Sequence, residues 1–199
     1  DYDYPLYVNA PLAAATTYTV TLLPGAHDPY GNTISQPYTY SFTTGPYPPE
    51  VQLNTYGQFG VYDANRPTEL FLLHRNVSRI DFTLSRLSLE EFGALTGPNG
   101  YDLLTSYTPA QDAIVRQWSE QTETELNTAF YRRVSLAEAG ASLRPGLYYL
   151  SVDTPEAGST IQHLLVVTNA NLTYKASFDE SLVWLTDLQS GQPIAGASV

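Results

Sequence analysis

Strict alternation of apolar and polar residues is the feature that most constrains the fold of this chain. In residues 18–22 (YTVTL) the side chains of Tyr18, Val20 and Leu22 share one face, and residues 38–43 (YTYSFT) repeat the pattern. A period of two is typical of antiparallel strands with one buried face. Between them, residues 24–32 are rich in Pro, Gly, Asp and Asn, which favour turns. We therefore expect the N-terminal part to be the closing half of a small β-sandwich.

A second set of strands is predicted further along the chain. In residues 79–87 (RIDFTLSRL), Ile80, Phe82 and Leu84 point one way, and the polar residues between them point the other way. The strands expected in this part are residues 69–74, 79–87, 129–136, 146–152 and 160–168. Short strands at regular spacing indicate a β-sandwich of the immunoglobulin or fibronectin type III kind.

Two short helices are expected to interrupt these strands. Residues 88–91 (SLEE) have the spacing of a capping box. The apolar stripe of this first helix would be Leu89, Phe92 and Leu95. Residues 108–111 (TPAQ) have the same spacing, with proline at the first helical position. The inner face of this second helix would be Ile114, Val115 and Trp118.

Composition and proline content divide the chain into parts. The first 65 residues contain no Lys or Arg, whereas all nine basic residues lie between Arg66 and Lys175. Residues 45–49 (GPYPP) hold three prolines in four positions, which favours a stiff, extended connection. We predict a domain over residues 1–45, a Pro-rich linker over 46–50, a second domain over 51–169 and a further segment over 170–199. The polar junction at residues 169–171 is short, so we expect the last two parts to be held closely.

The last nineteen residues begin a β-module. Residues 182–185 form an apolar strand, residues 189–193 are a turn cluster, and residues 194–199 start a second strand. Because a lone two-stranded hairpin is marginally stable at best in water, we expect further strands to complete this module. The chain is therefore interpreted as a slice of a longer, modular, β-rich protein.

Charge and cysteine content exclude several classes of function. The formal net charge is −11, from 20 acidic and 9 basic residues, which disfavours binding to nucleic acid or to anionic membrane surfaces. We expect no membrane insertion by this segment, since no apolar run approaches the roughly 18 residues that a spanning helix needs. The chain has no cysteine, so disulfides, thiolate nucleophiles and zinc–sulfur sites are excluded.

Few residues are candidates for a metal-binding site. The three histidines, His27, His74 and His163, are too far apart in sequence to indicate a ligand motif, and we expect them to be exposed or satisfied locally. Asp28 and Asn32 flank a glycine turn, where an Asx turn explains them better than calcium does.

Acidic clusters are the remaining candidates for catalysis. They are Glu90 with Glu91, and Glu120 with Glu123 and Glu125. Solvated helix ends are the favoured interpretation of both clusters. The chain has no Gly-x-Ser-x-Gly elbow and no phosphate-binding glycine loop. We expect no catalytic, cofactor-binding or metal-binding residues, no cofactor, and no enzymatic activity.

Aromatic residues allow two interpretations. Trp118 and Trp184 are expected to fill a core or an inter-domain contact. The N-terminal tyrosines could form a carbohydrate- or protein-binding surface, or could cover a neighbouring part of the same sandwich, which we favour. These tyrosines are Tyr2, Tyr4, Tyr7, Tyr30 and Tyr47.

Two stretches near the C-terminal end, residues 143–176 (LRPGLYYLSVDTPEAGSTIQHLLVVTNANLTYKA) and 182–199 (LVWLTDLQSGQPIAGASV), carry a family resemblance. They resemble the part of the bacterial alpha-2-macroglobulins in which one macroglobulin-like domain ends and the next begins. Residues 16–45 (TTYTVTLLPGAHDPYGNTISQPYTYSFTTG) are similar to the bacterial Ig-like domains that precede macroglobulin repeats. The resemblance implies that residues 1–45 end an Ig-like sandwich, 51–169 form a macroglobulin-like domain and 170–199 open the next one.

The resemblance also implies a function. The family forms large exported protease traps, often with a thioester made from a Cys and a Gln, and this span has no Cys. We therefore expect a non-catalytic scaffold segment of an endopeptidase inhibitor, located outside the cytoplasm in the periplasm, cell envelope or medium. Its partners would be neighbouring domains of the same parent chain and, through the full-length protein, target proteases. The alternative is a cell-surface adhesion or carbohydrate-binding module.

Overall fold

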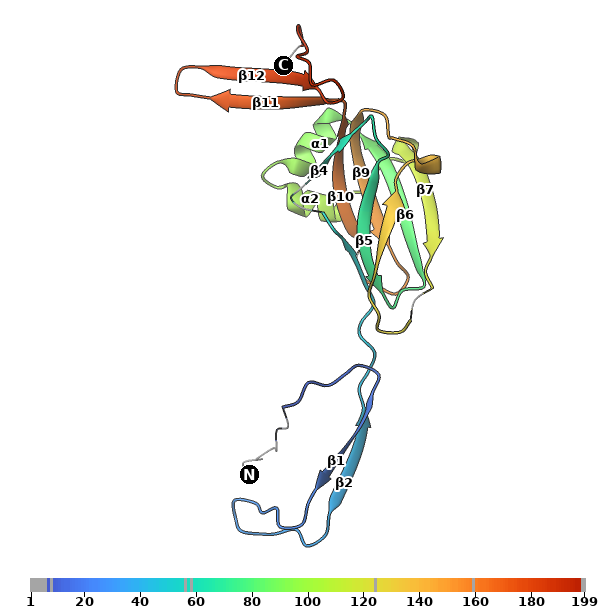
Figure 1. Ribbon diagram of the computed structural model, residues 1–199, viewed down its shortest axis with the longest axis vertical. Coiled ribbons are helices and arrows are strands. Elements are labelled where there is room, and N and C mark those ends of the chain that lie inside the picture. Colours follow the sequence, from blue (N-terminus) through green and yellow to red (C-terminus); the bar gives the residue numbers. More distant parts are fainter. Residues whose placement is uncertain are drawn as a thin grey trace. The chain divides into compact units, whose positions relative to one another are not determined.

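A computed structural model describes residues 7, 9–55, 57, 59–123, 125–158 and 160–197 of the chain. The chain divides into two compact units, Asp1–Pro48 and Pro49–Val199. Strands dominate both units, and short helices occur only in the second among the described residues (Figure 1). The predicted fold class, mainly β with short helices in the central part, is confirmed.

The first unit contains one antiparallel hairpin of β1 (Thr17–Leu22) and β2 (Tyr38–Thr43). Both strands lie where the alternation predicts them. The register places Tyr18 opposite Phe42 and Val20 opposite Tyr40 on one face. We expected that face to be buried, but Val20 and Tyr40 are exposed. This expectation was wrong for the described residues, because a two-stranded sheet has no second layer to cover it.

The second unit is built on a sandwich of two sheets. The three-stranded sheet has the order β3–β5–β8 and is antiparallel throughout. The five-stranded sheet has the order β4–β10–β9–β6–β7, and β4 joins it parallel to β10, whereas the other neighbours are antiparallel. The strands are β3 (Glu50–Leu53), β4 (Phe59–Asp63), β5 (Glu69–Arg75), β6 (Arg79–Leu87), β7 (Ile114–Gln121), β8 (Phe130–Ser135), β9 (Gly146–Asp153) and β10 (Ile161–Thr168).

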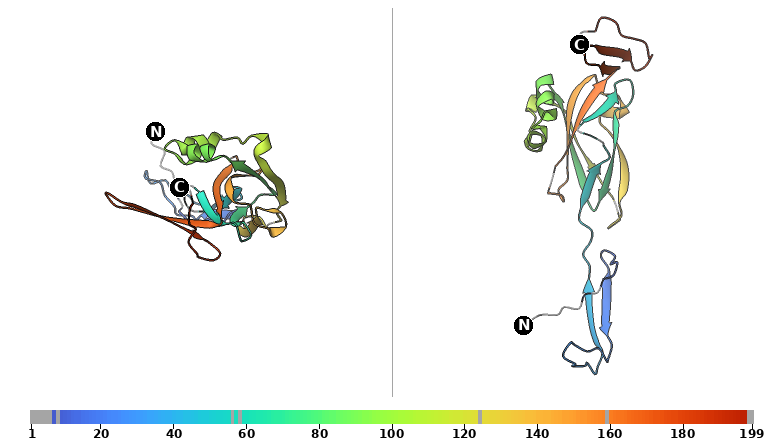
Figure 2. Two further views of the ribbon diagram at one scale, coloured as in Figure 1. Left: turned by 90° about the horizontal axis from the view of Figure 1, so that it is seen from above. Right: turned by 90° about the vertical axis from the view of Figure 1, so that its left-hand side faces the viewer.

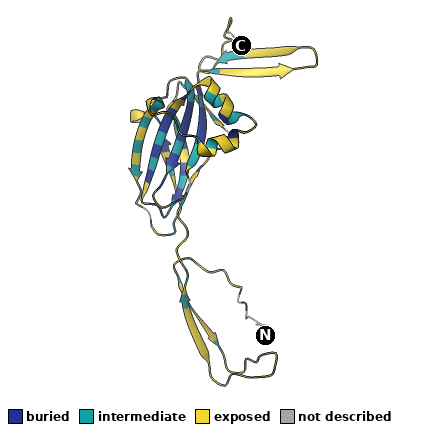
Figure 3. Ribbon diagram, turned by 180° about the vertical axis from the view of Figure 1, so that it is seen from behind, coloured by how far each residue is buried: buried dark blue, intermediate teal, exposed yellow. Residues whose placement is uncertain are grey.

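The core of this unit lies between the two sheets (Figure 3). Leu72 of the three-stranded sheet and Ile80, Leu84 and Leu150 of the five-stranded sheet are completely buried in it. In β6 the burial alternates, with Ile80, Phe82 and Leu84 inward, as the sequence pattern predicts. Full burial of a side chain of this size contributes about 1.5–3 kcal/mol, so this layer dominates the stability of the unit.

Two helices cover part of the outer face of the five-stranded sheet (Figure 2). Helix α1 (Leu89–Thr96) begins with the predicted capping box: the amide of Glu91 donates to the Ser88 hydroxyl, and the amide of Ser88 donates to the Glu91 carboxylate. Helix α2 (Gly100–Ser106) follows it. Leu95 of α1 packs in a second cluster with Tyr149 and Leu164 from the outer face of the sheet.

The helix predicted after residue 108 is wrong. Only a single 3-10 turn, η1 (Gln111–Ala113), occurs there, and Ile114–Gln121 is strand β7. In β7 Trp118 packs against the core, whereas Val115 is exposed. A register shift between Leu84 and Ser85 places Ile114 opposite Ser85, where it lines the outer face of the sheet. Another 3-10 turn, η2 (Glu138–Gly140), follows β8.

A second hairpin, of β11 (Ala170–Ala176) and β12 (Ser181–Asp187), ends the described chain. Strand β12 contains the predicted apolar strand, and a turn at its end brings Pro193 back beside Thr186. The amide of Ile194 donates to the carbonyl of Leu185 at 2.9 Å, so the predicted second strand starts to pair, although Ser198 and Val199 lie outside the described residues. Strand β11 was not predicted.

Candidate interaction surfaces

The hairpin of β1 and β2 has two chemically different faces. On one face the ring of Phe42 stacks on Tyr18 at a centroid distance of 5.7 Å and on Tyr40 at 6.1 Å. On the other face hydroxyl groups pair across the strands, for example Thr19 with Ser41 at 2.9 Å. The aromatic face is partly exposed to solvent, which is the usual property of a surface that contacts another polypeptide.

The tyrosines singled out from the sequence do not define this face. Tyr2 and Tyr4 lie outside the described residues. Tyr7, Tyr30 and Tyr47 are exposed, but none of them lies on β1 or β2. The aromatic face instead uses strand residues that the period-two pattern had already placed on one side.

The hairpin of β11 and β12 carries apolar side chains on both faces. The register pairs Leu172 with Leu185 on one face and places Trp184 opposite Thr173 on the other face. Trp184 is half exposed, so it fills no core among the described residues. Phe178, at the tip of the hairpin, is fully exposed. A strand pair that exposes apolar groups on both faces is suited to lie between two other layers of protein.

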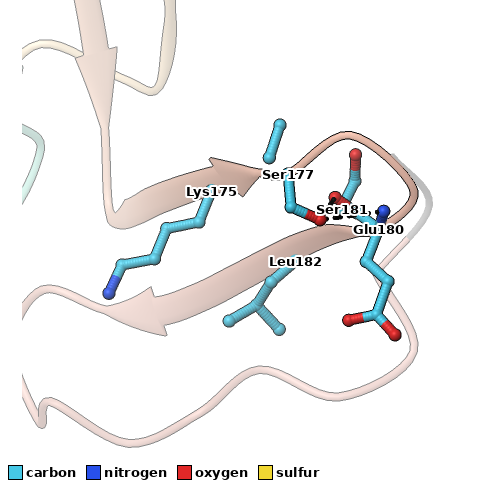
Figure 4. Close-up of a pocket in the computed structure, with 6 residues that line it drawn as sticks. Lys175, Ser177, Glu180, Ser181 and Leu182 are labelled. Atoms are coloured by element: carbon cyan, nitrogen blue, oxygen red, sulfur yellow. Dashed lines mark hydrogen bonds between the residues drawn. The ribbon is translucent and has the colours of Figure 1, made fainter.

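A concavity at the tip of this hairpin has a volume of about 660 Å³. In Figure 4 the side chains of Lys175 and Glu180 extend away from each other. The Ser177 hydroxyl is used within the turn, where it accepts from the Glu180 amide at 3.1 Å. The groups do not converge on a point, so the concavity has no arrangement for catalysis.

The three histidines have separate environments. His27 is exposed in the connection between β1 and β2. His74 and His163 are buried in the central unit, where His74 stacks on Phe130 and the Nε2 atom of His163 lies 3.0 Å from the Tyr62 hydroxyl. Burial lowers the pKa of His163 to about 4, so the imidazole is neutral at neutral pH.

The acidic candidates have structural partners. The Asp28 carboxylate accepts from the amides of Tyr30 and Asn32 at 2.9 and 2.8 Å, as the Asx-turn interpretation predicts. A hydrogen bond from the Asn32 side chain is the main cause that lowers the pKa of Asp28. The Ser88 amide and hydroxyl lower the pKa of Glu91 in the capping box.

The second acidic cluster belongs to a strand and the loop after it. Glu120 ends on the inner side of β7 and pairs with Arg132 of β8 at 3.0 Å, which links the two sheets. Glu123 and Glu125 are exposed in the following loop. The expectation that this cluster marks a helix end was wrong, because the segment before it is a strand.

Trp118 lies inside the central sandwich. Its ring is parallel to Phe82 at a centroid distance of 4.8 Å, and the Arg116 guanidinium lies 4.1 Å from the tryptophan ring. Arg116 also donates to the carbonyl oxygen of Ser135 in the opposite sheet at 2.9 Å. Trp118 therefore fills the core, as expected, and Arg116 closes this edge of the sandwich.

The described residues contain neither a metal-binding cluster nor a membrane-spanning helix. No group of three or more His, Asp or Glu side chains in this part of the chain is arranged to hold a metal ion. The helices that the structure describes lack the length and the apolar character to cross a membrane.

The fold of this chain is similar to that of known proteins. A bacterial Ig-like domain family matches residues 5–44. No curated protein sequence matches the chain. A crystal structure of Escherichia coli alpha-2-macroglobulin spanning domains MG0-NIE-MG1 is similar with a TM-score of 0.59 and 15% identity, over 92% of this chain and 60% of that one.

Two further structures show the same similarity. The Escherichia coli NIE-MG1 structure has a TM-score of 0.51 and 16% identity, over 74% of this chain and 73% of that one. Salmonella alpha-2-macroglobulin reacted with methylamine has a TM-score of 0.66 and 14% identity, over 92% of this chain and 12% of that one. This chain thus spans about an eighth of the larger structure, and it has the fold of a part of bacterial alpha-2-macroglobulin, as the sequence resemblance predicts.

Proposed function

We propose that this chain is a non-catalytic structural segment of a bacterial alpha-2-macroglobulin-like endopeptidase inhibitor. The similarity to bacterial alpha-2-macroglobulin over 92% of the chain supports this assignment. The observation that carries it is the contrast between a closed central sandwich and two hairpins with apolar faces in solvent. Such faces are suited to contact neighbouring domains of the same parent chain.

The proposal assigns each part of the chain to a domain. Residues 1–45 correspond to the end of an Ig-like domain in the position of MG0, and residues 46–50 are the linker. Residues 51–169 correspond to NIE, and residues 170–199 open MG1. This assignment is supported by the NIE-MG1 structure, which covers 74% of this chain, while Pro49–Val199 makes up about three quarters of it.

The segment itself acts by holding domains in place. Target proteases interact with the full-length inhibitor, and this segment supplies no catalytic residue, cofactor or metal. As part of an exported protein it lies outside the cytoplasm, in the periplasm, cell envelope or medium.

A protease-inhibition assay tests this proposal, because the segment and the full-length protein should behave differently in it. We expect the 199-residue chain to leave the cleavage of a large protein substrate unchanged, and the full-length protein to slow it. Cleavage of a small peptide substrate is the control, because a trap blocks access for large substrates while the protease active site stays open. Strong inhibition by the isolated chain would contradict the scaffold assignment.

A further inference from the structure

A polar groove crosses the outer face of the five-stranded sheet and is not explained by the scaffold role. Its volume is about 430 Å³. The floor is formed by β6, β7, β9 and β10. Residues 107–111, which lead from the end of α2 into η1, lie along one side. Helices α1 and α2 cover the neighbouring part of the same face, so the groove begins where that cover stops.

The floor is a row of neutral polar side chains on four adjacent strands. The register places Gln117 opposite Thr83, Thr83 opposite Ser151, and Ser151 opposite Gln162. Strands in a sheet are about 4.8 Å apart, so the row extends over roughly 14 Å. The Gln117 amide donates to the Thr83 hydroxyl at 3.1 Å, which fixes the amide at one end of the row.

The side of the groove is held by aromatic packing. Tyr107 meets Tyr149 edge to face at a centroid distance of 5.0 Å. The Tyr107 hydroxyl donates to the Glu91 carboxylate at 2.9 Å, which anchors this ring to helix α1. A partly exposed ring held at both ends offers a rigid apolar edge beside the polar floor.

The chemistry of the lining selects a class of ligand. Amide and hydroxyl side chains both donate and accept hydrogen bonds. Among the described residues that line the groove there is no Lys, Arg or His, and Asp153 is the one carboxylate. An anion would meet no positive charge there, and an apolar ligand would leave the row of amides and hydroxyls without partners. A ligand with many neutral hydroxyl groups could hydrogen-bond to the polar side chains of the floor and pack against the ring of Tyr107.

We propose that this groove binds a short neutral oligosaccharide, with Gln117 and Gln162 as its main hydrogen-bonding residues. The proposal adds a ligand-binding site to the central domain and does not depend on protease inhibition. The length of the row, roughly 14 Å by the strand spacing above, suits a few sugar units.

Calorimetric titration of the 199-residue chain tests the proposal. The probes are maltohexaose, cellohexaose and chitotetraose, each up to about 10 mM, which covers the weak end of specific binding. We expect saturable binding of at least one probe. The Gln117→Ala/Gln162→Ala variant should weaken it at least tenfold, and Gln117→Ala alone, at the exposed end of the row, should weaken it by a smaller factor.

Gln52→Ala is the matched control, since Gln52 is an exposed glutamine on β3 of the other sheet. This variant should bind like the wild type, and all three variants should keep the wild-type melting temperature. Absence of binding to all three probes, or an equal loss of affinity in the control, would overturn the proposal. Full retention of affinity in the double variant would overturn it as well.

Discussion

Tyr62 and His163 form a hydrogen-bonded pair inside the central sandwich, and Gly60 makes room for it. A Cβ atom at residue 60 would lie 2.7 Å from the Tyr62 ring and 2.9 Å from the Nε2 atom of His163. Glycine is therefore required by close approach, since its backbone angles are ordinary for a strand. The hydroxyl of Tyr62 satisfies an imidazole nitrogen that would otherwise be buried without a partner.

The buried imidazole makes stability depend on pH. His163 has a pKa of about 4 in the folded chain and about 6.5 when unfolded. Below pH 6.5 the unfolded chain binds a proton that the folded chain does not, so the free energy of unfolding falls as the pH drops from 6.5 towards 4. We expect a loss of about 2 kcal/mol between pH 7 and pH 5, measured by urea unfolding.

His163→Gln is the control for this pH effect. Glutamine can hydrogen-bond Tyr62 but does not titrate, so most of this loss should disappear in the variant. Burial, and to a smaller extent Arg132, also lowers the pKa of His74, so the comparison is the difference between the two proteins. An identical loss in both would show that His163 is not the group responsible.

Individual residues also explain where sequence reasoning failed. In β7 the inward positions include Arg116 and Glu120, which bond to Ser135 and Arg132 of the opposite sheet. Because these two inward positions are charged, the segment lacks the alternation of apolar and polar residues that would identify it as a strand. The residues Ile114, Val115 and Trp118 then fit a helix period by chance. Whether this segment forms a strand or a helix depends on side-chain partners in the other sheet, and these partners cannot be identified from the sequence alone.

At the scale of elements, the capping box that the sequence predicts at the start of α1 is present in the structure. Ser88→Ala removes the hydroxyl that accepts from the Glu91 amide at 3.1 Å. Loss of such a cap costs about 1 kcal/mol, and we expect this decrease in the free energy of unfolding. Chemical denaturation at neutral pH measures it.

Ser106→Ala provides the comparison at the other end of the helical segment. Its hydroxyl donates to the carbonyl of Asp102 at 3.3 Å and caps no helix start. We expect a change within about 0.5 kcal/mol. If both substitutions have equal effects, the cap contributes nothing specific.

Elements with strong local patterns were predictable, and elements defined by distant partners were not. The strands β5, β6, β9 and β10 lie within the predicted ranges or differ by a residue or two. Strand β4 contains a glycine and pairs with a strand from the far end of the domain. Strand β11 is an exception: it alternates Asn, Thr and Lys with apolar residues, but its polar start was interpreted as a junction. Helix α2 begins at Gly100 without a side-chain cap, which leaves no start signal.

The candidate surfaces were predictable only in part. Alternation placed Tyr18 and Val20 on one face, but exposure of that face depends on whether a second layer covers it. The groove on the five-stranded sheet depends on the register of four strands, which join residues up to 79 positions apart in the row from Thr83 to Gln162. No local pattern encodes that alignment.

At the scale of the whole molecule, the buried core of the described residues lies in the second unit. The two apolar clusters use residues from Val51 to Val167. A chain of residues 49–199 should therefore unfold cooperatively with the denaturant midpoint of the 199-residue chain. Removing residues 1–48 deletes a two-stranded hairpin, and such hairpins add little stability of their own.

The denaturant midpoints of the two chains are compared by equilibrium urea unfolding, followed by tryptophan fluorescence. Trp118 reports on the core of the second unit, because it stacks on Phe82. A fall of more than about 1 kcal/mol in the shorter chain would mean that the first unit stabilises the second.

The parallel pairing of β4 with β10 sets the order in which the domain can be completed during synthesis. Tyr62 and its hydrogen-bonding partner His163 are 101 positions apart. A ribosome adds about 5–20 residues per second, so β4 waits some 5–20 s for its neighbour. During that time the backbone groups of β4 that later pair with β10 are open to other chains, and the nascent domain is a natural client for a chaperone.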